Sequence, residues 1–289
     1  MVASSTQVAD TAQAHPAAIR ALEQRTIPGA TQPLAQALTA AHSAATARWI
    51  RETTTVNVPE LLAEFAAYVT RLLNAAFADK GRQAQRAAER AGFTAAHAGA
   101  RQASQLAATM RGTPTPPVNA APGDDAQAAA EAIPAAVQEE HNRALALLTT
   151  ASLTAMGLAG LNSVFARARR AIGRITAAIA VTITTAHAHG ANLAARALGT
   201  GVRLLWVPEP DACPACAAYA GRSIRPGGKF QGGLSTDPPR TVFLTAITGP
   251  PRHPRCRCVL IPWSPTWPLD GPPLPTLLRQ RAHAIRRTA

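Results

Sequence analysis

The sequence predicts a mainly α-helical protein in which an elongated helical body is followed by a small C-terminal α+β module. Two shifts in composition indicate this class. Of the 67 alanines among 289 residues, 58 precede residue 201, whereas 15 of the 24 prolines follow it. Alanine is the strongest helix former, while proline favours turns and short extended segments. Aromatic residues make up only 4% of the chain, so the core is expected to be thin.

The first part of the chain predicts an arm followed by helices. Residues 1–42 are rich in Ala, Gln, Thr and Pro without clear periodicity and predict a weakly ordered N-terminal arm. Residues 43–111 predict a helical region. Pro59 followed by Glu60 suits a helix start, and apolar residues recur from there to Phe77 at the spacing of an amphipathic helix. Gly81 is expected to interrupt the helix before a second one runs to about Arg111.

The middle of the chain predicts a linker and a second helical region. Four prolines within residues 112–123 remove amide donors and predict an extended linker. Residues 124–200 predict a helix from Asp124 to about Leu148, with Pro134 as a kink or delayed start, and a long or broken helix over about 151–198. Apolar residues spaced by three and four form a seam for a partner helix: Leu161, Phe165, Ala168, Ile172, Ile175, Ile179 and Ile183.

Residues 144–166 carry no charge over 23 residues, a length sufficient to span a bilayer. Their Thr, Ser and Asn content and their reliance on alanine favour a buried helix, so no membrane partner is expected. The N-terminus shows no secretory signal pattern, and synthesis in the cytoplasm is expected.

The charge distribution predicts an anionic partner for the second half of the chain. From residue 146 onward there are 17 Lys and Arg against 4 Asp and Glu, within a net charge of +13. Nucleic acid or an acidic protein ring would fit this charge. A solvated helix face is the simpler explanation for the first three of the candidate contacts, which are Arg167, Arg170, Arg174, Arg279, Arg281, Arg286 and Arg287.

Residues 201–262 carry all four cysteines, amid short predicted strands at 202–207, 258–261 and, less clearly, 241–247. Cys213 and Cys216 form a C-x-x-C pair, and 36 residues separate it from a second group with His253, Cys256 and Cys258. Thiolates and an imidazole at such spacings can surround a tetrahedral zinc ion. A closed site of four protein ligands leaves no place for a reacting water, so a structural zinc is predicted.

The fourth zinc ligand stays open at this stage. Cys213, Cys216 and Cys256 are the firmest candidates, and either Cys258 or His253 completes the set. On a strand, Cys256 and Cys258 would share one face, which slightly favours a four-cysteine site with His253 beside it. Two disulfides between the clusters, or reduced buried thiols, are the alternatives, which cytoplasmic synthesis and the ligand spacing make less favoured.

The C-terminal motifs resemble those of the phage head morphogenesis family, the Mu F-like minor capsid proteins, most closely the versions from actinobacterial phages and prophages. The resemblance covers about residues 150–262. It rests on Leu205-Trp206, Asp211-Ala-Cys-Pro-Ala-Cys216, Tyr219-Ala-Gly-Arg222, Gly227 to Phe230 and Pro250-Pro-Arg-His-Pro-Arg-Cys-Arg-Cys258. Many members carry an Arg-Thr-Glu element where this chain has Thr182 to His187, so the role of that element is in doubt here.

The resemblance implies a virion protein of low copy number inside the capsid or at the portal vertex, made in the host cytoplasm. Residues 124–200 would then be the helical head-morphogenesis region. The implied partners are the portal protein and other capsid components. Packaged DNA is a further expected partner, contacted without sequence specificity.

Other function classes fit the sequence less well, and no catalytic role is expected. The chain has no E-x-E element of the ADP-ribosylating domains fused to some relatives, and no His or Asn pattern of a His-Asn-His nuclease. His187 and His189 are two residues apart on a helix, which makes them weak metal candidates expected at an interface or the surface. A zinc-containing DNA-binding regulator is the alternative, and a membrane-associated phage protein is a weaker one.

The tail, residues 263–289, combines Pro and Trp with basic residues. Trp263 and Trp267 lie among prolines, ahead of the last arginines. Two exposed indoles could anchor a partner, and the basic end could meet nucleic acid. Equally, both indoles could fold back onto the zinc module.

Overall fold

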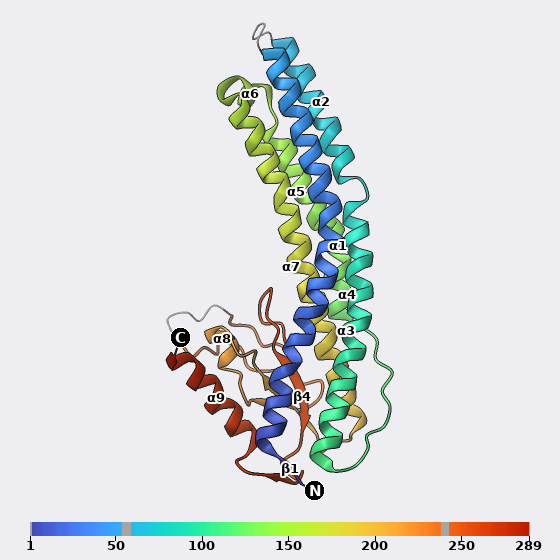
Figure 1. Cartoon of the computed structure of the whole chain (residues 1–289), viewed down its shortest axis with the longest axis vertical. Coiled ribbons are helices and arrows are strands. Elements are labelled where there is room, and N and C mark those ends of the chain that lie inside the picture. The colour runs from blue at the N-terminus through green and yellow to red at the C-terminus, as the bar shows by residue number, and fades with distance from the viewer. Residues whose placement is uncertain (1, 54–58, 238–242, 289) are drawn as a thin grey trace. The chain divides into compact units, whose positions relative to one another are not determined.

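A computed structural model describes residues 2–53, 59–237 and 243–288, with the backbone alone described at 53, 59 and 285–288. Helices dominate and short strands gather near the C-terminus, which confirms the predicted class. In chain order the elements of Figure 1 are β1 (Ala3–Ser4), α1 (Ser5–Thr53), α2 (Pro59–Phe77), α3 (Lys80–Arg111), α4 (Asp124–Glu131), α5 (Ile133–Leu147), α6 (Thr150–Met156), α7 (Leu158–Ala197), β2 (Arg203–Val207), α8 (Pro214–Ala217), β3 (Ser223–Ile224), β4 (Val259–Trp263), β5 (Leu269–Asp270) and α9 (Leu274–Thr288).

The chain forms two compact units whose boundaries differ from the predicted ones. Unit 1 contains Met1–Gln24, Glu89–Ala129 and Ala180–Ala289, and unit 2 contains Arg25–Ala88 and Ala130–Ile179. The divisions fall inside α1, α3, α4 and α7. The predicted linker at 112–123 is free of helix and strand, but both it and the change in composition at residue 201 lie within unit 1. Composition follows the type of secondary structure, whereas a unit is defined by the faces that pack together.

Helix α1 is a correction to the weakly ordered arm predicted for residues 1–42. It runs unbroken through that segment, and buried positions recur along it every three or four residues from Val8 to Glu23 and again from Ala30 to Ala45. Most of these positions hold small or polar residues, so a search for large apolar side chains does not detect the stripe. Its buried members include Val8, Ala12, His15, Ile19, Glu23, Ala30, Leu34, Leu38, Ala41 and Ala45.

Unit 2 is a bundle of helices. Its core contains the predicted seam of α7, where Leu161, Phe165 and Ile175 are fully buried. Helix α2 starts at Pro59 as predicted, but Gly81 lies inside α3 rather than between helices. A Cβ at Gly81 would come 2.9 Å from the Cα of Pro134, so this glycine permits close approach of α3 and α5. Helix α4 ends before Pro134, which confirms the break expected there.

A buried carboxylate explains much of the arginine stripe on α7. Glu140 is 1% exposed, and its oxygens lie 3.1 Å from Nε of Arg167 and 3.2 Å from Nε of Arg174. Arg143 also pairs with it at 3.4 Å. Arg167 and Arg174 therefore have an intramolecular role that the prediction of a solvated or partner-binding face missed. Arg170 is exposed, and its contact with a partner stays a prediction.

Replacing Glu140 by glutamine is expected to lower the free energy of unfolding by about 3 kcal/mol, because it leaves clustered arginines without their buried counter-charge. Urea denaturation followed by circular dichroism measures this loss. The control is Glu139→Gln, because Glu139 is half exposed and pairs with Arg143 at the surface. That change should cost about 0.5 kcal/mol. Equal midpoints for the two variants would contradict the assigned role of Glu140.

The uncharged stretch at 144–166 does not form one buried helix. It is divided among the end of α5, all of α6 and the start of α7. Thr149 caps α6 in a reciprocal arrangement with Ser152, and Gly157 has φ 55°, so local chemistry breaks the helix twice. By length and composition alone, two helical segments could cross a membrane: Glu60–Arg111 and Leu158–Ala197, the second with 56% of its most apolar window buried.

Unit 1 packs the ends of α3 and α7 against each other and against the strands. Gly99 and Gly190 lie at the contact, where a Cβ on either would overlap a backbone carbonyl of the facing helix, that of His187 or Ala96. His187 is 2% exposed and its Nε2 lies 2.7 Å from Oε1 of Gln102 in α3, which puts it at the interface between the two helices, one of the two positions expected for it. Burial lowers the pKa of His187 to about 3, so its imidazole is neutral at neutral pH.

Two small sheets complete unit 1. An antiparallel sheet has the order β3-β2-β4, which confirms the strands predicted near 202–207 and 258–261. In the third predicted segment, Thr241 and Val242 lie outside the described residues, and Ile247 forms an isolated bridge with Phe230. A short parallel pair joins β1 to β5, and Arg281 of α9 pairs with Asp10 of α1 at 2.7 Å. Residues near both ends of the chain therefore meet.

Candidate metal centre

Strand pairing brings the two predicted ligand clusters to one end of the three-stranded sheet. Val207 at the end of β2 pairs with Val259 at the start of β4. The first cluster follows β2 and the second precedes β4, so both clusters lie beyond the same ends of these paired strands. Hydrogen bonding between the strands thus brings together residues that lie about 40 positions apart.

Local turns orient the ligands within each cluster. Cys213 precedes the single-turn helix α8, and its carbonyl accepts a hydrogen bond from the amide of Ala217, which puts Cys213 and Cys216 on one side of the turn. In the second cluster the amide of Cys256 donates to the carbonyl of His253 at 3.0 Å. Arg255 between them has φ 67°, a left-handed conformation that closes this turn. Cys258 lies immediately before β4 rather than within it, so the strand-face argument for its pairing with Cys256 does not apply.

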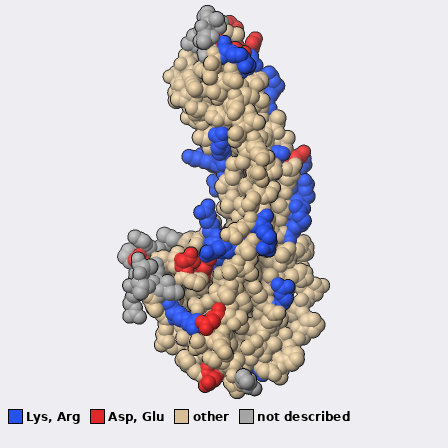
Figure 2. All heavy atoms as spheres, viewed as in Figure 1, with Lys and Arg blue, Asp and Glu red and all other residues tan. Residues whose placement is uncertain are grey.

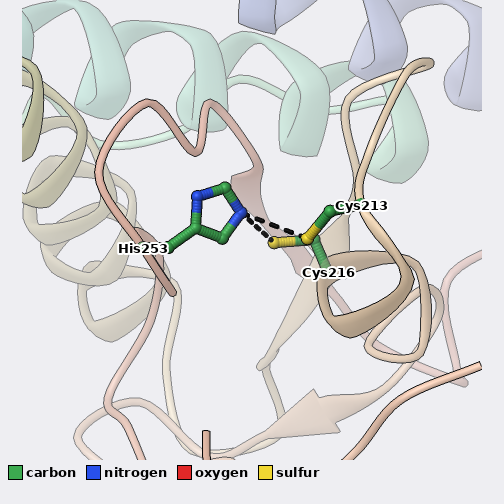
Figure 3. A group of neighbouring side chains, drawn as sticks. All are labelled: Cys213, Cys216 and His253. Carbon is green, nitrogen blue, oxygen red and sulfur yellow. Dashed lines mark hydrogen bonds between the residues drawn. The ribbon is translucent and has the colours of Figure 1, made fainter. Parts of the chain in front are cut away.

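The five side chains form a cluster that could hold a metal ion. Nε2 of His253 lies 3.2 Å from Sγ of Cys213 and 3.4 Å from Sγ of Cys216, as Figure 3 shows. Sγ of Cys216 lies 3.5 Å from Sγ of Cys256. Two groups of three ligand atoms arise, one with Cys213 and His253 and one with Cys256 and Cys258, and Cys216 belongs to both. All four cysteines lie among the described residues and are free thiols.

These separations are close to those around a tetrahedral ion. With metal–sulfur bonds of about 2.3 Å, two thiolates on a tetrahedron lie about 3.8 Å apart, and a thiolate and an imidazole nitrogen about 3.6 Å apart. Binding of an ion would therefore require only small side-chain movements.

Charge is unevenly shared within the cluster. Hydrogen bonds from Cys216 and His253 lower the pKa of Cys213 to about 4, and the same contact with Cys213 raises the pKa of His253 to about 9. Burial raises the pKa of Cys258, while hydrogen bonding from Cys216 lowers that of Cys256. The cluster thus favours thiolate at some sulfur atoms, and thiolate is the form that binds metals.

The surroundings of the cluster are rigid. Cys216, Cys256 and Cys258 are buried in one hydrophobic cluster with Trp206, Tyr219 and Phe230. The ring of Trp206 lies 4.8 Å from that of Tyr219 and 5.2 Å from that of Phe230. This packing gives the Trp of the motif a role as the centre of the module's core.

Helix α7 also supports the second cluster directly. Thr184 is fully buried, and its hydroxyl donates a hydrogen bond of 3.0 Å to the carbonyl of Cys256. Thr184 lies within the segment that departs from the family's Arg-Thr-Glu element. Here, that segment supports the backbone of a candidate ligand.

An ion-pair network that the sequence did not predict joins the second cluster to α1. Arg257, between two candidate ligands, pairs with Glu23 of α1 at 2.7 Å and with Glu209 at 3.7 Å. Glu209 also pairs with Arg20 of α1. Both glutamates are nearly fully buried. Burial raises the pKa of Glu23 against the opposing effect of Arg257. In the sequence, the one feature that could have pointed to this ion-pair network is the position of Arg257 between two cysteines.

The tail, residues 263–289, is part of unit 1. Trp267 packs against the hydrophobic cluster of the module, so the fold-back alternative describes this indole, while Trp263 ends β4 and is partly buried. Helix α9 buries Leu274 and Leu278. Arg281 pairs with Asp10, and Arg279 donates to the carbonyl of Gly221 at 3.3 Å. The predicted contacts of Arg286 and Arg287 lie outside the described side chains.

On the face shown in Figure 2, Lys and Arg side chains are more prominent than Asp and Glu.

Comparison of the chain with protein-family models, with curated proteins and with solved structures found no match.

Proposed function

We propose that four of the five clustered side chains hold a structural zinc ion. Mixed thiolate and imidazole donors at near-tetrahedral separations favour zinc over ions that prefer oxygen ligands. Cys213, Cys216 and Cys256 form the common set, and Cys258 or His253 completes it. Zinc bound in this way would contribute on the order of 10 kcal/mol to the folding of the module.

The fourth ligand can be identified by comparing two variants. His253→Ala and Cys258→Ser each remove one candidate donor. The variant with the lower zinc content after purification without chelator identifies the residue that completes the site. Undiminished zinc in the double variant, which lacks both His253 and Cys258, would contradict a site built from these residues.

On this site we base the proposal that the protein is a minor capsid protein of a tailed phage or prophage, acting in head morphogenesis at the portal vertex. The observation that carries it is the meeting of Cys213-x-x-Cys216 and His253-x-x-Cys256-x-Cys258 around Trp206, the same motifs that resemble the family. The excess of basic residues after residue 146 suits a place between a protein ring and packaged DNA. The proposed role is structural rather than catalytic.

Particle incorporation tests this proposal. A tagged chain is produced during phage growth or prophage induction, and particles are purified by density gradient and analysed by mass spectrometry. The chain should sediment with portal and major capsid proteins at low copy number. Cys216→Ser should reduce incorporation, whereas Ala246→Ser, at an exposed residue of the module, should not. Absence of the wild-type chain from particles that contain the portal protein would overturn the proposal.

The alternative of a zinc-containing regulator has less support. Between the two ligand clusters, α8 is the only helix among the described residues, and it has four residues. A recognition helix needs several turns to reach base edges in the major groove. No described element between the clusters meets this requirement.

A further inference from the structure

A pocket between the module and the C-terminal helix is lined by basic side chains that are not candidate ligands of the metal centre. It has a volume of about 360 Å³ and lies among α8, the turn at 235–236 and α9. Two arginines, a histidine and two hydroxyl residues line it, together with alanines, and no carboxylate does so among the described residues. The lining consists of Ala217, Ala218, Ala220, Arg222, Ser235, Thr236, Arg279 and His283.

The walls of the pocket are held firmly. Gly221 has φ 65°, and a Cβ at this position would overlap the carbonyl oxygen of Pro275, so only glycine permits α9 to approach so closely. Arg279 donates to the carbonyl of Gly221, which fixes the helix to the turn after α8. Leu278, one residue earlier, is fully buried. The pocket is therefore preformed.

The hydrogen-bond inventory leaves donors for an anion. Each guanidinium carries five N–H groups. Arg222 donates from Nε to the carbonyl of Ala218 at 3.1 Å, and Arg279 donates to Gly221 and to Oγ1 of Thr276. The hydroxyls of Ser235 and Thr236 donate to backbone carbonyls and offer no further proton. Among the described residues, the remaining N–H groups of both arginines and the ring of His283 are the donors that face no protein acceptor and could serve a ligand.

We propose that this pocket binds a phosphate group. A phosphate has several charged oxygens that accept hydrogen bonds, and this pocket has two guanidinium groups and one imidazole that can donate them. A guanidinium can donate two parallel N–H···O hydrogen bonds to one phosphate. No Asp or Glu follows Asp270 in the chain, so no acidic residue of the C-terminal helix competes for these donors. The phosphate could belong to a nucleic-acid backbone or be a free anion. If the phosphate belongs to DNA, the pocket adds a DNA contact to the proposed function and rests on that function. If the phosphate is a free anion, the pocket does not depend on the proposed function.

Binding measurements on the full-length, metal-loaded protein test this site with two probes. Inorganic phosphate is titrated calorimetrically, and a fluorescent DNA duplex is followed by anisotropy over a range of salt concentrations. The pocket variant is Arg222→Gln with His283→Gln, which leaves the contacts of Arg279 with Gly221 intact. The matched control is Arg90→Gln with Arg101→Gln, two exposed residues of α3. Circular dichroism and metal content verify folding of each variant.

The wild type is expected to bind at least one probe, and the pocket variant to bind that probe about tenfold more weakly or worse, while the control retains affinity for phosphate. For DNA, the slope of log affinity against log salt concentration should fall by about one for each phosphate that the variant no longer binds.

The two probes also distinguish the source of the phosphate. Binding of duplex alone identifies the nucleic-acid backbone, and binding of inorganic phosphate alone identifies a free anion. Failure of both probes, or equal affinity of the pocket variant and wild type, overturns the proposal. Phosphate binding by a chain that never enters particles would refute only the proposed function.

Discussion

Cys216→Ser is expected to abolish metal binding and to unfold the C-terminal module while unit 2 stays helical. Cys216 is the one ligand shared by both groups of donor atoms, and it is 1% exposed. Its loss removes a metal contribution on the order of 10 kcal/mol, which is comparable to the whole stability of an ordinary domain. Metal content by mass spectrometry and the near-ultraviolet signal of Trp206 measure the two effects.

A substitution at an exposed residue of the same module provides the control for Cys216. Ala246→Ser adds a hydroxyl without removing a ligand, and it should change stability by about 0.5 kcal/mol or less. Chelation of the wild-type protein should reproduce the Cys216→Ser phenotype. A Cys216→Ser protein with a full equivalent of zinc and an unchanged near-ultraviolet spectrum would disprove the shared-ligand arrangement.

Gly190→Ala is expected to destabilise unit 1 by about 3 kcal/mol or more. A Cβ at this position overlaps the carbonyl oxygen of Ala96, and backbone atoms cannot move aside as a flexible side chain can, so α3 and α7 would have to separate. The separation would also disturb Thr184, which supports Cys256 from the same helix. Denaturant unfolding at a fixed metal concentration measures the loss.

Gly173→Ala is the matched control in the same helix. No atom outside the local helix backbone lies within 4 Å of a Cβ built there. Since alanine has the higher helix propensity, this change should stabilise the protein by about 0.5–1 kcal/mol. The two glycine substitutions should thus have opposite signs. Stabilisation by both would show that α3 and α7 do not pack as closely as described.

The features that the sequence predicted correctly depend on local patterns. The start of α2 at Pro59 and the buried seam of α7 follow from residues close together in the chain. The meeting of the cysteine clusters was also foreseen, because the chemistry of thiolates and imidazole restricts what such spacings can serve. The sequence was therefore sufficient to predict those features that are determined by residue type and by spacing along the chain.

The features that the sequence did not predict depend on tertiary partners. Helix α1 was missed because alanine, His15 and Glu23 hold many of its buried positions, which leaves large apolar residues such as Ile19 and Leu34 widely spaced. The pairing of Arg257 with Glu23 joins residues more than two hundred positions apart, and no local pattern marks it. The same holds for Glu140, whose burial depends on arginines supplied by another helix.

The parallel pairing of Ala3–Ser4 with Leu269–Asp270 has a consequence for biosynthesis. On the ribosome, β1 is synthesised long before its partner strand, because all the helices from α1 to α8 are translated between them. Contacts of such long sequence separation form slowly, since a large loop must close before they contribute stability. Unit 1 therefore completes its folding only after β5 has emerged, and until then the surface that β5 will cover stays exposed to solvent.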